Sequence, residues 1–255
     1  MSFSYCTIQM SALSSLCEYD SEESDCDTKS TKNKKLKLRL PDLSAVPVIP
    51  TENYTDNCDL HAGRLRSFPH VRGNWSSFVY IQYTEDEDFL KLFKKLQAKV
   101  FEIDGSCYKC DDFHISLSKT VVLQYHLITS FSTTLQKILS DFESFKLSYD
   151  SVKIYCNEEN TRTFVALEVD HFSKKYLMHM TDKIDNVLKE YNLPTFYENP
   201  SFHMSILWLN GNKKAQLINI LDNLNDILLN KNLKTIHINK VNCKVGNKYF
   251  QYFLL

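Results

Sequence analysis

Two short segments of the chain carry the same alternation of apolar and polar residues. Phe113–Leu117 reads Phe-His-Ile-Ser-Leu, and Phe202–Ile206 reads Phe-His-Met-Ser-Ile. In a β-strand, residues i and i+2 point to the same face. We therefore expect the histidine and serine of each segment to project together while the apolar residues enter a core. An imidazole beside a hydroxyl can transfer protons and hold an anion. The candidate catalytic residues are therefore His114, Ser116, His203 and Ser205.

Two such pairs are suited to phosphodiester transfer in RNA. A histidine titrates near pKa ~6.5, so one imidazole can be neutral while the other is protonated. The neutral ring would take the proton of a 2′-hydroxyl that attacks phosphorus, and the protonated ring would give a proton to the departing 5′-oxygen. The serine hydroxyls would donate to the non-bridging oxygens as charge builds up on them. This chemistry needs no metal or other cofactor, and the sequence shows no carboxylate–histidine cluster that would bind one.

Other sequence patterns fit less well. The chain has no G-x-S-x-G motif, and a serine two residues from its histidine on one strand stands beside it, which does not suit an acyl-transfer triad. Two more His-x-Ser/Thr matches exist, at residues 171–173 and 179–181. The first lies where a strand is expected to give way to a helix, so Ser173 could cap that helix. The second lies inside an expected helix, where residues i and i+2 diverge.

The elements that must position the two pairs can be read from hydrophobic periodicity. The expected strands are Ser77–Tyr83, Phe113–Lys119, Phe145–Tyr155 (one strand or a pair), Thr163–Val169, Phe202–Leu209 and a pair within Lys234–Leu255 that turns near Gly246. The expected helices are Asp86–Phe101, Leu127–Phe142, Ser173–Tyr191 and Lys213–Leu229. Each half of this order reads strand, helix, His-Ser strand, helix, strands, which indicates an internal duplication. We expect an α+β fold with two pseudo-symmetric lobes, about 75–155 and 156–255, whose antiparallel sheets flank a central cleft, with helices on the outside.

The bulk composition sets limits on partners and location. The chain has 255 residues and a net charge of −1, so any contact with nucleic acid needs local basic patches. It has no run of 18 apolar residues, which argues against a membrane partner. Residues 1–50 lack periodicity and are expected to form a disordered tail, followed by a catalytic domain over 51–255. Lys29–Arg39 holds six basic residues in eleven, which is typical of a nuclear import signal or of a solvated linker.

The eight cysteines are scattered, which is typical of reduced thiols in a cytosolic or nuclear protein. Cys107 and Cys110 form the single C-x-x-C and have no second motif to complete a zinc site. We therefore expect an ordinary loop pair there.

Several segments resemble a known family. Paired His-x-Ser/Thr strands are typical of the 2H phosphoesterases, and further segments are similar to the U6 snRNA 3′-end phosphodiesterases within that group. These segments are HVRGNW (70–75), HISLSKTVVL (114–123), VKIYCNEENTRTFVALEV (152–169), NLPTFYENPSFHMSILW (192–208) and VNCKVGNKYF (241–250). The similarity covers roughly residues 64–255, and it includes segments without catalytic residues.

The resemblance implies a nuclear, metal-independent 3′-to-5′ exoribonuclease. Such an enzyme trims the 3′ oligouridine tail of U6 snRNA by 2′-hydroxyl transesterification and leaves a 2′,3′-cyclic phosphate. It implies that His114 and His203 are the acid–base pair and that Ser116 and Ser205 bind the phosphate. Which histidine is the base stays open, because the two pairs are alike in sequence. The implied partner is the single-stranded 3′ end of U6 snRNA, and we expect the protein to be a monomer.

The resemblance also points to residues that would bind the substrate. Tyr197 matches a tyrosine that stacks on the terminal base, and ordinary packing in a loop is the alternative. The other substrate-binding candidates are Asn199, Pro200, Ser201, Glu158 and Ile115. The chain has Glu158 where the resembled family has Gln, and Asn199 where it has Asp. Lys119, Arg162 and Arg72 could line a basic groove or be ordinary surface charges.

Two other functions remain open at this point. A 2′,3′-cyclic phosphodiesterase or an RNA-ligase-like 2H enzyme would use the same four residues with another nucleophile. A non-catalytic RNA-binding scaffold could also reuse the fold.

Overall fold

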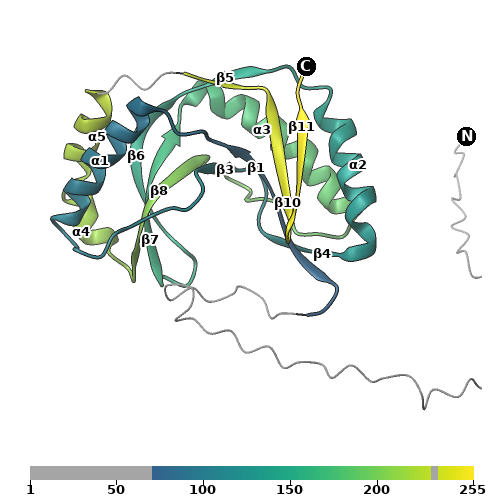
Figure 1. Cartoon of the computed structure of the whole chain (residues 1–255), viewed down its shortest axis with the longest axis horizontal. Coiled ribbons are helices and arrows are strands. Elements are labelled where there is room, and N and C mark those ends of the chain that lie inside the picture. Colours follow the sequence, from purple (N-terminus) through teal and green to yellow (C-terminus); the bar gives the residue numbers. More distant parts are fainter. Residues whose placement is uncertain (1–70, 231–234) are drawn as a thin grey trace, which may run out of the picture. The chain divides into compact units, whose positions relative to one another are not determined.

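A long antiparallel sheet runs through the part of the chain that the structure describes. The computed structural model describes residues 71–230 and 235–255, which belong to one compact unit (Figure 1). The expected tail over 1–50 and its basic cluster lie outside these residues. The strands are β1 (Asn74–Gln82), β2 (Tyr108–Lys109), β3 (His114–Ser116), β4 (Val121–Gln124), β5 (Phe145–Leu147), β6 (Tyr149–Cys156), β7 (Arg162–Val169), β8 (His203–Asn210), β9 (Ile236–Ile238), β10 (Lys240–Val245) and β11 (Lys248–Phe253).

Helices lie outside the strands. They are α1 (Glu87–Phe101), α2 (Ile128–Leu139) with a preceding 3₁₀ turn at Tyr125–Leu127, α3 (His171–Glu190), α4 (Lys214–Ile218) and α5 (Leu221–Leu229). In Figure 1, α1, α4 and α5 lie beyond β6, and α2 and α3 lie on the side of β10 and β11. The α+β class and the antiparallel sheets with outer helices are as predicted.

The strand order explains how the two His-Ser segments come together. The sheet runs β11-β10-β1-β3-β8-β7-β6, with β2 added to β8 and β4 added to β1, and β5 and β9 form a separate pair. The strands β3 and β8 are neighbours in the middle of this order. We call the side formed by β1, β10 and β11 the β10 flank, and the side formed by β7 and β6 the β7 flank. β10 comes from the second half of the sequence and β6 from the first, so each flank combines strands of both halves.

Local signals in the sequence fix the elements next to the site. Asp86 caps α1, because its carboxylate accepts the backbone N–H of Phe89 at 2.7 Å. The buried residues Phe89, Leu92 and Leu96 then follow at helical spacing and pack into the core beneath the sheet.

The hairpin of β10 and β11 turns at Gly246 and Asn247, as predicted. Val245 pairs with Lys248, which leaves a two-residue loop. Gly246 has φ of +57°, and a Cβ there would lie 2.2 Å from Cε3 of Trp75. Glycine is therefore required twice, for its backbone angle and for the close approach of the indole ring.

Three features differ from the predicted elements. The expected helix 213–229 is divided into α4 and α5 around Ile220, whose φ is −110°. The apolar period continues through this point, so periodicity alone does not show the break. The two-residue strand β2 has both side chains exposed and no alternation to reveal it. The strand β4 was not predicted. It and β3 are two short strands that pair in succession with one long strand, since β4 pairs with Asn74–Ser77 of β1 and β3 pairs with Tyr80–Gln82 of β1.

Candidate active site

The two His-Ser segments lie on adjacent antiparallel strands of one sheet. Ile115 of β3 pairs with Met204 of β8. Because antiparallel strands run in opposite directions, His114 comes beside Ser205 and Ser116 beside His203. The two pairs are thus related by a local twofold axis through the Ile115–Met204 pair. One pocket of about 310 Å³, which we call the catalytic pocket, is lined by His114, Ser116, His203 and Ser205.

Each imidazole is held in the same way by the backbone two residues before it. The Nδ1 atom of His114 lies 3.0 Å from the carbonyl oxygen of Asp112, and that of His203 lies 2.6 Å from the carbonyl oxygen of Ser201. A carbonyl oxygen only accepts, so Nδ1 must donate its proton in both rings. Nε2 is therefore left to exchange a proton with a substrate, as a general acid or base requires.

Aromatic residues fix the planes of the two rings differently. Tyr155 of β6 stacks on His203, with ring centroids 4.0 Å apart and an interplanar angle of 18°. The Tyr155 hydroxyl also lies 2.6 Å from Oγ of Ser201, the residue whose carbonyl holds His203. Tyr80 instead meets His114 edge-on at 5.5 Å. Tyr155 is a positioning residue that the sequence analysis missed, since no motif links it to His203.

Burial lowers the pKa of both imidazoles from 6.5, because desolvation disfavours the charged ring. The hydrogen bonds to the backbone carbonyls act in the opposite direction. Each ring also has one carboxylate that raises its pKa, Asp112 for His114 and Glu168 for His203. Lys244 lowers the pKa of His114, and His114 lowers that of His203. Both rings are thus kept neutral to lower pH than a free histidine.

The rest of the catalytic pocket includes a cation and aromatic rings. Its other lining residues are Cys110, Asp111, Asp112, Arg162, Phe164 and Trp208. The guanidinium of Arg162 lies 5.6 Å from the ring centroid of Trp208, and Tyr108 stacks on Trp208 at 4.5 Å. Of the three basic residues suggested by the sequence, Arg162 is therefore the one that lines this pocket. Arg72 is exposed near the start of the described residues.

Tyr197 and Lys119 lie together outside the lining of the catalytic pocket. Tyr197 is 49% exposed, and Nζ of Lys119 lies 4.4 Å from its ring centroid. Burial raises the pKa of Tyr197, and the charge of Glu158, which is exposed in the turn between β6 and β7, raises it further. These contacts gather the predicted substrate-binding tyrosine, a cation and a carboxylate in one region.

The remaining substrate candidates have different surroundings. Ser201 supports His203 through its carbonyl and Tyr155 through its hydroxyl. Asn199 is exposed and Pro200 is partly buried in the same loop. Ile115 is 2% exposed, so its side chain belongs to the core and does not reach the pocket. Its contribution is the pairing with Met204 that sets the site.

The cysteine pair lies beside the site. Cys107 and Cys110 flank β2 and are partly buried, and Cys110 lines the catalytic pocket. Within residues 71–230 and 235–255, no three His, Cys, Asp or Glu side chains are grouped so that they could hold a metal ion. In the same residues no helix is long and apolar enough to span a membrane.

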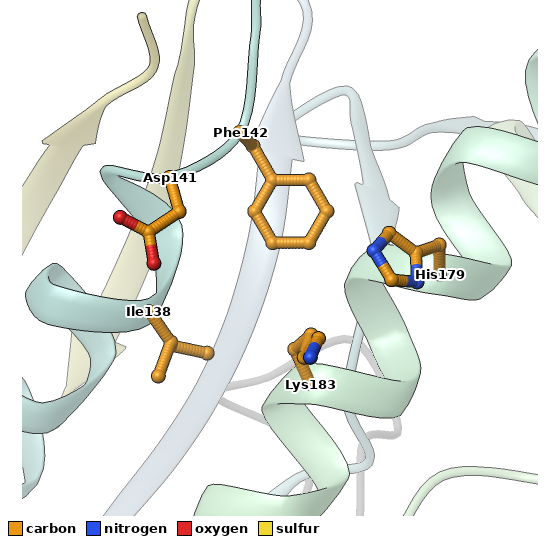
Figure 2. A pocket seen from close by; sticks show the side chains of 5 residues that line it. All are labelled: Ile138, Asp141, Phe142, His179 and Lys183. Carbon is orange, nitrogen blue, oxygen red and sulfur yellow. The ribbon is translucent and has the colours of Figure 1, made fainter.

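The other two His-x-Ser/Thr matches lie on α3, away from the catalytic pocket. Asp170 caps this helix and its carboxylate accepts from Ser173, so the cap is one residue before His171 and is not Ser173 itself. His179 lines a separate pocket of about 280 Å³ with Lys183 and residues near the end of α2. Figure 2 shows this pocket with Ile138, Asp141, Phe142, His179 and Lys183 around it.

Comparison with known proteins identifies the family. The family model HVSL, described as "Uncharacterised conserved protein", matches residues 35–252. U6 snRNA phosphodiesterase 1 of Mus musculus is 37% identical over 224 residues, which cover 84% of this chain and 82% of the mouse protein. The Homo sapiens protein of that name is 38% identical over 207 residues, which cover 78% and 77% of the two chains. This chain belongs to the U6 snRNA phosphodiesterase 1 family.

A solved structure shares the fold of this chain. Usb1 of Kluyveromyces marxianus has a TM-score of 0.52 at 13% identity, and the match covers 70% of this chain and 98% of that one. The same yeast protein with uridine monophosphate has a TM-score of 0.50. The predicted α+β fold with antiparallel strands is therefore confirmed, and Usb1 shares it.

Proposed function

We propose that the protein is a 3′-to-5′ exoribonuclease that trims the 3′ oligouridine tail of U6 snRNA and leaves a 2′,3′-cyclic phosphate. The observation that carries this proposal is the catalytic pocket, where two histidines and two serines meet across one strand pair. Membership in a family whose relatives are named U6 snRNA phosphodiesterase supports the choice of substrate.

The reaction uses the two pairs in complementary ways. The 2′-oxygen of the penultimate nucleotide attacks phosphorus while Nε2 of one histidine takes its proton. The bond from phosphorus to the 5′-oxygen breaks, and Nε2 of the other histidine gives that oxygen a proton. Ser116 and Ser205 donate to the non-bridging oxygens. The acid and the base each supply about 10²–10⁴-fold. Each ring has one carboxylate that raises its pKa and one positive group that lowers it, Lys244 for His114 and His114 for His203, so these charges suit either histidine to either role.

The region of Tyr197 is suited to the terminal nucleotide. An exposed ring can stack on a base, and Lys119 above that ring can pair with a phosphate. The charge of Glu158 acts on Tyr197, and a carboxylate can accept a hydrogen bond from the N3–H of uracil.

A trimming assay tests the proposal. The full chain is incubated with a 3′-oligouridylated RNA in EDTA, and the RNA ends are analysed. We expect trimming in EDTA that is lost in His114→Ala and in His203→Ala but retained in His179→Ala, a matched change on α3. An absolute requirement for an added divalent metal would contradict the mechanism.

The chemistry of the new end separates this function from the alternatives. A cyclic phosphate agrees with transesterification by the 2′-hydroxyl. A linear phosphate would instead favour hydrolysis, as in a 2′,3′-cyclic phosphodiesterase. RNA binding without turnover in the wild-type protein would favour a scaffold.

We further propose that the protein acts in the nucleus as a monomer. The support for its location is the basic cluster at Lys29–Arg39 together with the substrate. A fluorescent fusion with all six basic residues changed to Gln should lose its nuclear enrichment. Unchanged enrichment would remove this cluster as the signal.

A further inference from the structure

A smaller pocket of about 140 Å³ adjoins the catalytic pocket on the β10 flank of the sheet. We call it the flank pocket. It shares the lining residues Asp112 and His114 with the catalytic pocket, so the two pockets are neighbours. Its other lining residues are Phe78, Tyr80, Gln82, Lys244 and Tyr249. The trimming reaction outlined above assigns no part of the substrate to this pocket.

The side chains of the flank pocket have the chemistry of a site for single-stranded RNA. Lys244 lies on β10, opposite Phe78 of β1 and Tyr249 of β11 in the strand register. Its Nζ is 5.1 Å from the ring centroid of Tyr249, which is 64% exposed. A cation next to an exposed aromatic ring can hold a phosphate and a base of the same nucleotide.

The position of the flank pocket selects which part of the RNA it would bind. In an in-line displacement, the attacking and leaving oxygens lie on opposite sides of phosphorus. The terminal nucleotide is placed at Tyr197, whose loop is tied to the β7 flank through Ser201 and Tyr155. The strand that stays on the enzyme must therefore continue toward the other flank, beyond His114.

We propose that the flank pocket binds the nucleotide on the 5′ side of the scissile phosphodiester, with Lys244 contacting its 5′-phosphate and Tyr249 stacking on its base. This inference rests on the proposed function and adds a specific site for the retained strand. Among the residues that the structure describes, Lys244 is the one lysine or arginine that lines this pocket, so the phosphate is placed at Lys244. Gln82 can then hydrogen-bond to the ribose or to the base edge.

A pair of dinucleotides tests the phosphate contact. We compare kcat/KM for UpU and for pUpU, which differ only in the 5′-phosphate. The wild-type protein should prefer pUpU by about threefold to tenfold, the range for a single partly exposed charged contact. Lys244→Ala should lose this preference. Lys248→Ala is the matched control, because Nζ of Lys248 lies 4.9 Å from the ring of Tyr125 on the same flank but outside the pocket.

The ring contact is tested with the same substrates. Tyr249→Ala should raise KM for pUpU about threefold to tenfold, as expected for partial loss of a base stack, and Tyr249→Phe should restore it. Tyr125→Ala should leave KM unchanged. Equal preference for pUpU in the wild-type, Lys244→Ala and Lys248→Ala proteins would overturn the assignment, and so would a wild-type protein that does not distinguish the two substrates.

A binding measurement separates this inference from the proposed reaction. A fluorescent oligouridine with a 2′-deoxy penultimate ribose lacks the nucleophile and cannot be cut by transesterification. We expect Lys244→Ala and Tyr249→Ala to weaken binding of this oligouridine more than Lys248→Ala and Tyr125→Ala do. That result supports the flank pocket as an RNA-binding site even if the protein does not trim RNA. If the protein trims RNA but all four variants bind the oligouridine equally, the assignment of the retained nucleotide to the flank pocket is wrong and the proposed reaction is still supported.

Discussion

At the scale of single residues, the two histidines are alike in their hydrogen bonds but unlike in their ring contacts. Both donate Nδ1–H to the carbonyl two residues earlier, whereas Tyr155 stacks on His203 alone. Tyr155 also bonds to Ser201, so one side chain fixes both the plane of the ring and the residue that orients it. Such support matters because an imidazole must keep Nε2 within hydrogen-bond reach of the reacting oxygen.

Replacement of Tyr155 should separate these two contacts. Tyr155→Phe keeps the stack and removes the bond to Ser201, so we expect kcat to fall about threefold to tenfold with little change in KM. Tyr155→Leu removes both contacts, so its kcat should fall further. Tyr176→Phe on α3, which keeps its stack on Phe145, is the control. Equal kcat in Tyr155→Leu and wild type would show that Tyr155 does not position His203.

The pH dependence of trimming follows from the burial of the two rings. Burial lowers both pKa values from 6.5, and Lys244 adds to the lowering for His114, as His114 does for His203. The hydrogen bonds to the backbone carbonyls and the carboxylates of Asp112 and Glu168 act in the opposite direction. The histidine that acts as the general acid must be protonated, and with a lowered pKa it becomes protonated only at lower pH. We therefore expect a bell-shaped dependence of kcat/KM on pH. The two apparent pKa values of the histidine pair should both lie below 6.5. A maximum above pH 7 would contradict this.

At the scale of elements, the hairpin of β10 and β11 carries one side of the flank pocket. Its turn depends on Gly246, which has a positive φ and lies against the ring of Trp75. Lys244 and Tyr249 stand on either side of that turn. The stability of a turn outside the catalytic pocket thus affects where the retained strand can bind.

Gly246→Ala should destabilise the protein more than a comparable change elsewhere. We expect a loss of about 2–4 kcal/mol in the free energy of unfolding, from the backbone angle and from the overlap with Trp75. Gly211→Ala is the matched control, because its φ is +73° but nothing lies within 4 Å of an added Cβ. Chemical denaturation measures both. Equal losses in the two variants would show that the indole moves aside at little cost.

At the scale of the whole molecule, RNA binding has to come from a few placed cations, because the net charge is −1. Around the two pockets these cations are Arg162, Lys244 and Lys119. Each phosphate that is neutralised on a single strand contributes about −0.7 to the slope of log K against log salt. Binding should therefore depend only moderately on salt.

The uncleavable oligouridine provides the measurement. Two or three neutralised phosphates correspond to a slope of about −1.4 to −2.1 in a fluorescence titration over a range of salt concentrations. Lys244→Ala removes one phosphate contact and should make the slope shallower by about 0.7. A much steeper slope would mean that cations elsewhere, such as those of Lys29–Arg39, also bind the RNA.

The sequence alone determined the elements and the four catalytic candidates. Alternation over Phe113–Leu117 and Phe202–Ile206 reports which side chains share a face, since strand geometry is local. The same locality explains the accurate start of α1 after Asp86 and the turn at Gly246. The short strand β2 and the break at Ile220 left no local signal.

Only the tertiary structure decided what stands around the catalytic pairs. The pairing of Ile115 with Met204 places each histidine beside the serine of the other segment, and no spacing in the sequence encodes that register. Tyr155 reaches His203, 48 positions away in the chain, because the sheet places β6 next to β7 and β7 next to β8. Contacts of this kind depend on strand order and on long-range packing, whereas periodicity reports only on neighbours along the chain.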